Sequence, residues 1–198
     1  MKKLVAMAIA SVLVIGMAFF TACIPGKKLK VTLYLNGTLG DKSFYDSAGR
    51  GLEKAIDELG IEGETIEGGY DQTRWEPDLE QVSRGDADII IVGTWQMKEI
   101  LEKIAPRHPL KKYFIFDTAV DYTKPGLHNV YSILYKQNEG SFLAGALAAL
   151  VTASDMARVN KDKTVGFLGG IDESTINDFK AGYIQGVHHI DPEIQVLV

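Results

Sequence analysis

Short apolar runs alternate along this chain with amphipathic stretches, and this alternation restricts the possible fold more than any other feature. The run Ile89-Ile90-Ile91-Val92 suits a strand that is buried on both faces. Within residues 41–59, apolar side chains recur at steps of three and four residues, and Gly60 follows, which is typical of a helix with a glycine cap. A series of strands and helices with short connections predicts an α/β fold, in which helices cover both faces of a doubly wound parallel sheet.

The alternation is interrupted once, at a segment that contains Pro125 and Gly126, and then restarts. We therefore expect a first lobe over residues 29–122, a crossing segment over residues 123–129 and a partial second lobe over residues 130–198. The expected strands are residues 29–35, 64–67, 88–92, 113–117, 130–133, 163–168 and 194–198. The expected helices are residues 41–59, a short helix opened by Pro77, residues 96–105 stopped by Pro106, residues 139–151, and residues 174–189 capped by Ser174. No helix follows the last strand, which predicts an exposed edge in the second sheet.

The N-terminus has the parts of a bacterial export signal. Met1-Lys2-Lys3 is cationic, residues 4–20 are almost unbroken apolar sequence, and small residues precede Cys23. The position of this single cysteine resembles the lipobox of lipoproteins. We therefore expect residues 1–22 to be a signal peptide, Cys23 to carry palmitate and other lipid, and residues 23–28 to form a tether. A plain transmembrane anchor is the alternative, although the run falls short of the roughly 20 apolar residues of a spanning helix.

Composition argues against several functional classes. The net charge is −5, and no long basic run follows the first residues, so nucleic acid is not an expected partner. If Cys23 carries lipid, no thiol remains for a disulfide, a metal or catalysis. The four histidines lack the spacing of zinc ligands. We expect neither a metal nor a cofactor.

Polar and aromatic side chains follow several predicted strands, at the edge where parallel α/β sheets bind ligands. The candidates are Asn36, Asp41, Phe44, Trp95, Asp117 and Gly169. Structural roles are the alternatives: Asp41 as a helix cap, Phe44 and Trp95 as core residues, Asp117 as a local cap. Residues 36–44 match neither the P-loop pattern nor the dinucleotide-binding pattern. The candidates include no nucleophile paired with a base, so we do not expect an enzyme.

Three motifs then resemble the Bmp (basic membrane protein) family, which comprises substrate-binding lipoproteins of ABC transporters and includes purine nucleoside receptors. The first is Gly40-Asp41-Lys42-Ser43-Phe44-Tyr45-Asp46-Ser47, followed by Gly51-Leu52. The second is Asn138-Glu139-Gly140-Ser141-Phe142-Leu143-Ala144-Gly145, and the third is Val165-Gly166-Phe167-Leu168-Gly169-Gly170 with Phe179, Gly182 and Gly186. With the lipobox, the resemblance covers roughly residues 20–198.

The resemblance implies a periplasmic-binding-protein-like fold, in which two α/β lobes close on a ligand. It suggests that Phe44 and Phe179, from different lobes, sandwich a purine base. It also suggests that Asn36 lies near the base or ribose and that Asp117 binds a polar edge of the nucleoside. Family members continue past the last residue of this chain, so the resemblance also implies a C-terminal truncation that leaves the second lobe incomplete.

We therefore expect a lipid-anchored protein on the extracytoplasmic face of the cell membrane, which binds a nucleoside and delivers it to ABC permease subunits. Three alternatives remain open. One is a surface sensor or adhesin of the same fold, and another is a truncated remnant that binds nothing. The third is a hydrolase of nucleosides or sugars with Asp41 or Asp117 as its acid or base.

Overall fold

Five parallel strands form the sheet of the first lobe, in the order β2-β1-β3-β4-β5. They are β1 (Lys30–Leu35), β2 (Glu62–Glu67), β3 (Ile89–Gly93), β4 (Lys112–Phe116) and β5 (Val130–Ile133). The computed structural model describes residues 27–157, 159 and 162–198. The predicted signal peptide, Cys23 and all but the end of the tether therefore lie outside the described residues.

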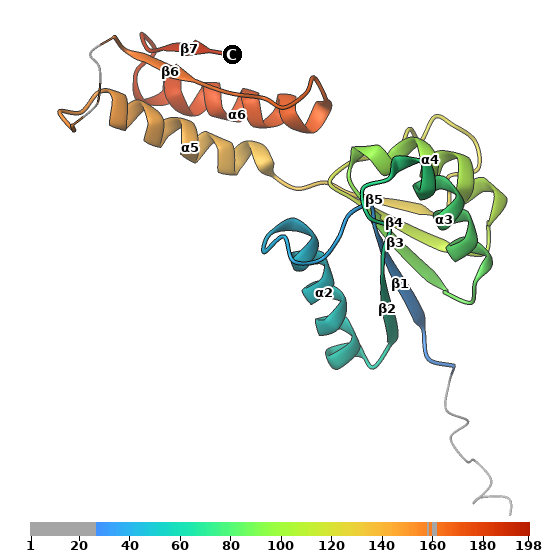
Figure 1. The fold of residues 1–198 in the computed structure, drawn as a ribbon. Helices are drawn as coiled ribbons and strands as arrows, with labels where there is room; N and C mark the ends of the chain where they lie inside the picture. Colours follow the sequence, from blue (N-terminus) through green and yellow to red (C-terminus); the bar gives the residue numbers. More distant parts are fainter. Residues whose placement is uncertain (1–26, 158, 160–161) are drawn as a thin grey trace, which may run out of the picture.

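The two faces of this sheet are covered unequally (Figure 1). Helices α3 (Gln72–Arg84) and α4 (Lys98–Ile104) pack on one face, and the short 3₁₀ turns η1 (Trp95–Met97) and η2 (Ala105–Arg107) flank α4. Among the described residues, α2 (Phe44–Leu59) is the only helix that packs on the other face, where it meets β1 and β2. The larger core therefore lies on the α3–α4 side.

The second unit consists of α5 (Gln137–Thr152), α6 (Ser174–Ile190) and a parallel pair of short strands, β6 (Thr164–Gly166) and β7 (Gln195–Leu197). The two helices lie side by side along their length, and β6 and β7 pack on them through Val165 and Val196 (Figure 1). The predicted α/β class is confirmed, with a second lobe that holds only a two-stranded sheet. None of the helices in the described residues has the length and apolarity needed to cross a membrane.

Glycines bring the backbones of α5 and α6 into contact. A Cβ atom added at Gly145 would lie 2.0 Å from the carbonyl oxygen of Tyr183, and one at Gly186 would lie 1.9 Å from that of Phe142. Such separations leave no room for a methyl group, so the two helices approach this closely only because these positions are glycine. The close approach buries Ala149 and Val187 completely.

The predicted crossing segment is placed wrongly. Residues 123–129 connect β4 to β5, and β5 pairs with β4, so both belong to the first lobe. The chain leaves this lobe at residues 134–136, between β5 and α5. Residues 130–133 form a strand as expected, but pairing with β4 buries Val130 in the core of the first lobe.

Three helix starts also differ from the predictions. Pro77 lies inside α3, which begins at Gln72 because the carboxylate of Asp71 accepts a hydrogen bond from the amide of Thr73. Ser174 does not cap α6; the side chain of Glu173 does, by accepting from the amide of Thr175. The predicted helix over residues 41–59 begins at Phe44, after a loop.

Candidate functional site

A hollow of about 260 Å³ lies between the two lobes, at the carboxyl ends of β3 and β4. The first lobe contributes three residues that the sequence predicted, namely Phe44, Trp95 and Asp117. Phe44 is the first residue of α2, whereas Trp95 and Asp117 follow the ends of β3 and β4. The second unit contributes the residues that lead into α6 and its first turn. The remaining lining residues are Thr94, Gln96, Ile171, Glu173, Thr175 and Ile176.

Asn36 anchors a chain of polar groups beside this hollow. It follows β1, is buried, and donates from Nδ2 to Oγ1 of Thr94 over 2.9 Å. The Thr94 hydroxyl in turn donates to Oε1 of Gln96 over 2.6 Å. The buried Oδ1 of Asn36 has no hydrogen-bond partner among the residues that the structure describes. Thr94 adopts a φ of 70°, a strained conformation for a β-branched residue.

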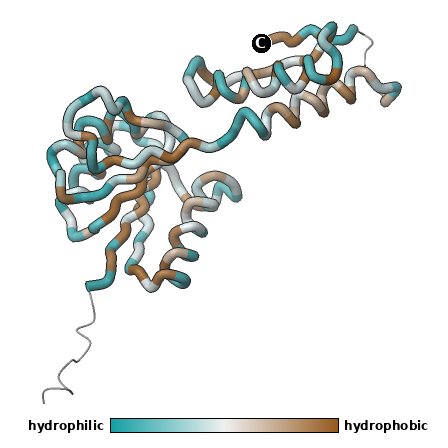
Figure 2. The backbone as a smooth tube through the Cα atoms, turned by 180° about the vertical axis from the view of Figure 1, so that it is seen from behind, coloured by the Kyte–Doolittle hydropathy of each residue, from teal (hydrophilic) through white to brown (hydrophobic). Residues whose placement is uncertain are grey.

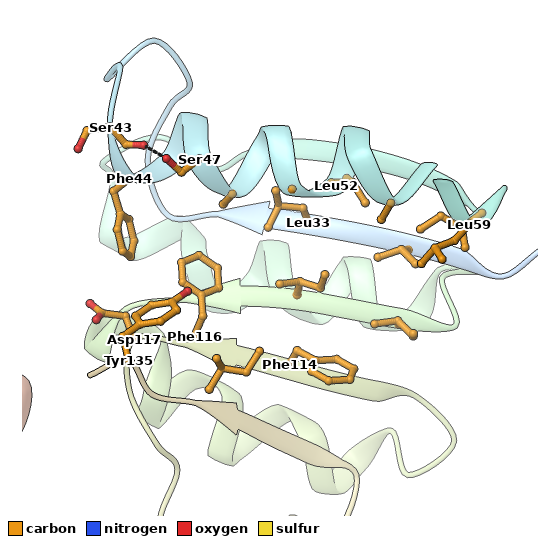
Figure 3. Close-up of a pocket in the computed structure, with 18 of the residues that line it drawn as sticks. Leu33, Ser43, Phe44, Ser47, Leu52, Leu59, Phe114, Phe116, Asp117 and Tyr135 are labelled. Carbon is orange, nitrogen blue, oxygen red and sulfur yellow. Dashed lines mark hydrogen bonds between the residues drawn. The ribbon is translucent and has the colours of Figure 1, made fainter. Parts of the chain in front are cut away.

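Phe44 is the aromatic residue best placed to meet a ligand. It begins α2, is half-buried, and lines both the hollow between the lobes and a larger hollow on the first lobe. Its ring centroid lies 5.3 Å from that of Phe116, at an interplanar angle of 45°. Figure 3 shows Phe44, Phe116 and Tyr135 gathered beside Asp117 at the carboxyl ends of the strands. The site therefore has an aromatic wall on the first lobe.

Two further rings face solvent near this wall. Phe179 lies on α6, is 38% exposed, and lines the larger hollow together with Phe44. Its backbone is fixed by Ser141 of α5, whose hydroxyl donates to the Phe179 carbonyl over 2.6 Å. Trp95 is 46% exposed and lines the smaller hollow. Exposed aromatic rings on both sides of a gap provide stacking surfaces for a flat ligand.

Asp117 lies at the junction of the two lobes. It follows β4 with a φ of 64°, and its backbone carbonyl accepts a hydrogen bond of 3.3 Å from the Thr175 hydroxyl of α6. Burial, and secondarily the nearby carboxylate of Glu173, raise the pKa of the Asp117 carboxyl above its ordinary value. A carboxylate that is partly desolvated favours a ligand that donates hydrogen bonds.

We expect Asp117→Asn to stabilise the folded protein at neutral pH. The pKa of the Asp117 carboxyl is higher in the folded protein than in the unfolded chain, where it is about 3.9. The contribution of this carboxyl to stability is therefore fully present below the unfolded pKa and is lost as pH rises through the folded-state pKa. The amide removes that loss, so urea unfolding at pH 7 should show a higher midpoint, with the difference shrinking as pH falls toward the unfolded pKa. No difference at pH 7 would contradict the desolvation of Asp117.

Asp41→Asn is the matched control, and its expected effect on the stability of the folded protein is the opposite. Backbone amides, first that of Ser43, lower the pKa of Asp41. Its stabilising effect is therefore present above its unfolded pKa and is lost as pH falls through the folded value. This variant is expected to lower the urea midpoint at pH 7.

Three predicted site residues, Asn36, Asp41 and Gly169, lie outside the lining of both hollows. The carboxylate of Asp41 accepts hydrogen bonds from the amides of Ser43, Tyr45 and Asp46, so it caps the start of α2. Gly169 is exposed, and an added Cβ there would lie 3.1 Å from Ile176. The structure therefore brings Phe44, Trp95 and Asp117 together, connects Asn36 to them through Thr94, and leaves Asp41 and Gly169 apart from them.

Sequence reasoning missed Thr94, Gln96, Glu173 and Thr175. Thr94 precedes Trp95 directly after β3, and its place at a strand end is a signal that could have found it. Glu173 and Thr175 reach the site only because the start of α6 meets the residue after β4, where the Thr175 hydroxyl donates to the Asp117 carbonyl, and no local pattern shows this contact. In the parts of the chain that the structure describes, no three His, Cys, Asp or Glu side chains gather as a metal site requires.

Comparison with known families identifies the architecture. The model of the Bmp family, described as ABC transporter substrate-binding protein PnrA-like, matches residues 28–198. The chain belongs to the Bmp family. This match confirms the resemblance that the three motifs indicated. Because the family consists of substrate-binding proteins of transporters, the match also agrees with the expectation that the chain is not an enzyme.

Curated Bmp relatives are about twice as long as the region they share with this chain. The CD4+ T-cell-stimulating antigen of Listeria monocytogenes is 32% identical over 164 residues, which are 81% of this chain and 43% of that protein. Basic membrane protein A of Borreliella burgdorferi is 29% identical over 167 residues, 84% of this chain and 46% of that protein. The chain thus spans about half the length of these relatives.

A solved structure supports the fold. An ABC transporter solute-binding protein from Aeropyrum pernix K1 superposes with a TM-score of 0.69 at 28% identity, over 85% of this chain and 46% of that one. The two lobes of this chain therefore have the architecture of part of a solute-binding protein.

Proposed function

We propose that this chain is the ligand-binding part of an ABC importer's receptor and that it binds a nucleoside, with a purine as the expected base. The single observation that carries the proposal is the position of Phe44. This half-buried ring begins α2 and lines the hollow between the lobes, where Asp117 and Glu173 offer carboxylates. A flat base would stack on the ring, and ribose hydroxyls would donate to the carboxylates.

Both aromatic rings of the proposed sandwich are on the described part of the chain. Phe44 belongs to the first lobe and Phe179 to the second, and both line one hollow. Closure of the lobes would bring the rings to opposite faces of the base, the usual hinge motion of binding proteins. Asn36 would offer its unpartnered Oδ1 to an amino group of the base.

The alternative of a nucleoside or sugar hydrolase has less support. Asp41 caps α2 through three backbone amides and lies outside both hollows, so it does not form a carboxylate pair with Asp117. The arrangement around Asp117 suits capture of a ligand by hydrogen bonds and stacking, without a covalent step.

Saturation-transfer NMR on the full chain in detergent tests the proposal, because this method detects weak complexes. We expect transfer to the base protons of inosine and adenosine and little transfer to free ribose. A folded chain that shows no transfer to any nucleoside would overturn the proposed ligand. Release of free base from inosine would instead favour a hydrolase.

We also propose that Cys23 anchors the protein by lipid on the extracytoplasmic face of the membrane, where permease subunits would receive the ligand. Acyl chains contribute about 0.8 kcal/mol per buried CH₂, so two or more hold a protein firmly. We expect mass spectrometry of the mature protein to show a lipidated Cys23 at its start and Cys23→Ala to abolish lipidation. Retention of residues 1–22 would contradict the anchor.

A further inference from the structure

Polar groups that could distinguish one base from another lie beyond the carboxyl ends of the strands in the first lobe. The strands β1, β3 and β4 are mostly hydrophobic (Figure 2), whereas the segment after β3 brings polar side chains to the hollow between the lobes. Among the described residues that line this hollow, Gln96 is the only one with a side-chain amide. An amide has donors on its nitrogen and an acceptor on its oxygen, so its orientation determines which groups of a ligand it can bind.

Two hydrogen bonds determine the orientation of the Gln96 amide. The Nδ2 atom of Asn36 donates to the Thr94 hydroxyl over 2.9 Å, and this hydroxyl donates to Oε1 of Gln96 over 2.6 Å. A hydroxyl has one hydrogen, and here it is directed to Gln96. The Gln96 oxygen is therefore occupied, whereas its Nε2 has no hydrogen-bond partner within the part of the chain that the structure describes.

The backbone fixes the turn that carries Gln96. The amide of Thr94 donates to the carbonyl of Phe116 over 2.9 Å, and the amide of Met97 donates to the carbonyl of Thr94 over 3.2 Å. The Met97 side chain is fully buried in the core on the α3–α4 side. Gln96 therefore lies on a turn that is held at both ends, which preorganises its two N–H groups for a ligand.

We propose that the N–H groups of Gln96 select nucleosides of 6-oxopurines, such as inosine and guanosine, over adenosine. This inference rests on the proposed function, because it takes the base to stack on Phe44 in the same hollow. The bases of inosine and guanosine carry a carbonyl oxygen at C6, which accepts from an N–H group, whereas adenine carries an amino group there, which is itself a donor. Adenine would leave donors facing each other without partners, which lowers affinity.

Carboxylates are the competing determinants of base choice. Asp117 and Glu173 line the same hollow and, when ionised, only accept hydrogen bonds. A carboxylate that met the group at C6 would favour adenosine, because the amino group donates. In the proposed complex these carboxylates bind ribose hydroxyls, which leaves Gln96 for the base. The direction of the preference between inosine and adenosine therefore tells which group meets the base.

Calorimetric titration of the full chain in detergent with inosine, guanosine and adenosine tests the proposal. We expect inosine and guanosine to bind roughly tenfold more tightly than adenosine. In Gln96→Glu, the ionised carboxylate keeps an acceptor for the Thr94 hydroxyl but has no N–H group. This variant should bind inosine roughly tenfold more weakly, and adenosine at least as tightly, as the unaltered chain does. A loss of structure would weaken the binding of both nucleosides alike and would not change which of them binds more tightly.

Gln185→Glu is the matched control, because Gln185 is exposed on α6 and lies outside both hollows. It carries the same chemical change and should leave both affinities unaltered. Gln96→Ala is the second variant, and it should bind inosine and adenosine with similar affinities.

Equal binding of inosine and adenosine by the unaltered chain, or tighter binding of adenosine, would overturn this inference and leave the proposed function standing. A preference for inosine that persists in Gln96→Ala would also overturn it. A folded chain that binds no nucleoside would overturn both the inference and the proposed function.

Discussion

Gly186→Ala is expected to destabilise the α5–α6 unit by roughly 1–3 kcal/mol, the usual cost of overpacking. The added methyl carbon would lie 1.9 Å from the carbonyl oxygen of Phe142 and 2.9 Å from the amide nitrogen of Ala146. Both neighbours are backbone atoms of α5, so no flexible side chain can move aside, and the helices must separate. Separation would loosen the contacts of Val187 with Ala149 and Ile194.

Gly140→Ala on α5 is the matched control, because nothing lies within 4 Å of its added Cβ. Alanine there should stabilise the helix by up to about 1 kcal/mol through propensity alone. Urea unfolding of the full chain, followed by circular dichroism, measures both variants. The two substitutions should have opposite signs; a stabilising Gly186→Ala would show that the helices do not touch at this position.

Phe44→Ala is expected to weaken nucleoside binding at least tenfold. Stacking of an aromatic side chain on a base contributes about 1–3 kcal/mol, and tenfold corresponds to about 1.4 kcal/mol. The substitution removes the ring that lines both hollows and also its contact with Phe116. Titration of the full chain with inosine, followed by calorimetry or saturation transfer, measures the change.

Tyr70→Ala is the control for this experiment. Its ring is 69% exposed and lies outside both hollows, so its removal should leave the affinity unchanged. Circular dichroism must show that the Phe44 variant keeps its native structure, because the ring also packs against the core beside α2. Unchanged affinity in a folded Phe44 variant would remove this ring from the site.

Local patterns predicted the elements of the fold well. The run at Ile89 became a strand whose Ile90 and Val92 are buried, although Ile89 and Ile91 on its other face are only partly buried. The three- and four-residue spacing in residues 41–59 became α2, ended by Gly60 in the left-handed conformation. These features depend on the properties of neighbouring residues, which the sequence displays directly. The motif glycines Gly145 and Gly186 were recognisable by resemblance, although only the structure shows that they bring two helix backbones together.

Features that depend on distant packing could not be predicted. The assignment of residues 130–133 to the second lobe failed because pairing with β4 decides their place, and a four-residue strand carries no mark of its partner. The contact between Thr175 and Asp117 spans 58 residues of sequence. Pro77 suggested a helix start, but the capping by Asp71 and the buried Trp75 extend α3 beyond it on the N-terminal side.

A crystal structure of the protein with bound inosine would test the central claim most directly, namely that rings from two lobes hold a nucleoside between them. We predict the base stacked on Phe44, with Phe179 on its other face and the ribose hydroxyls within hydrogen-bond distance of Asp117. A base bound away from Phe44, or both rings packed into the interior with the gap between the lobes empty, would contradict the account.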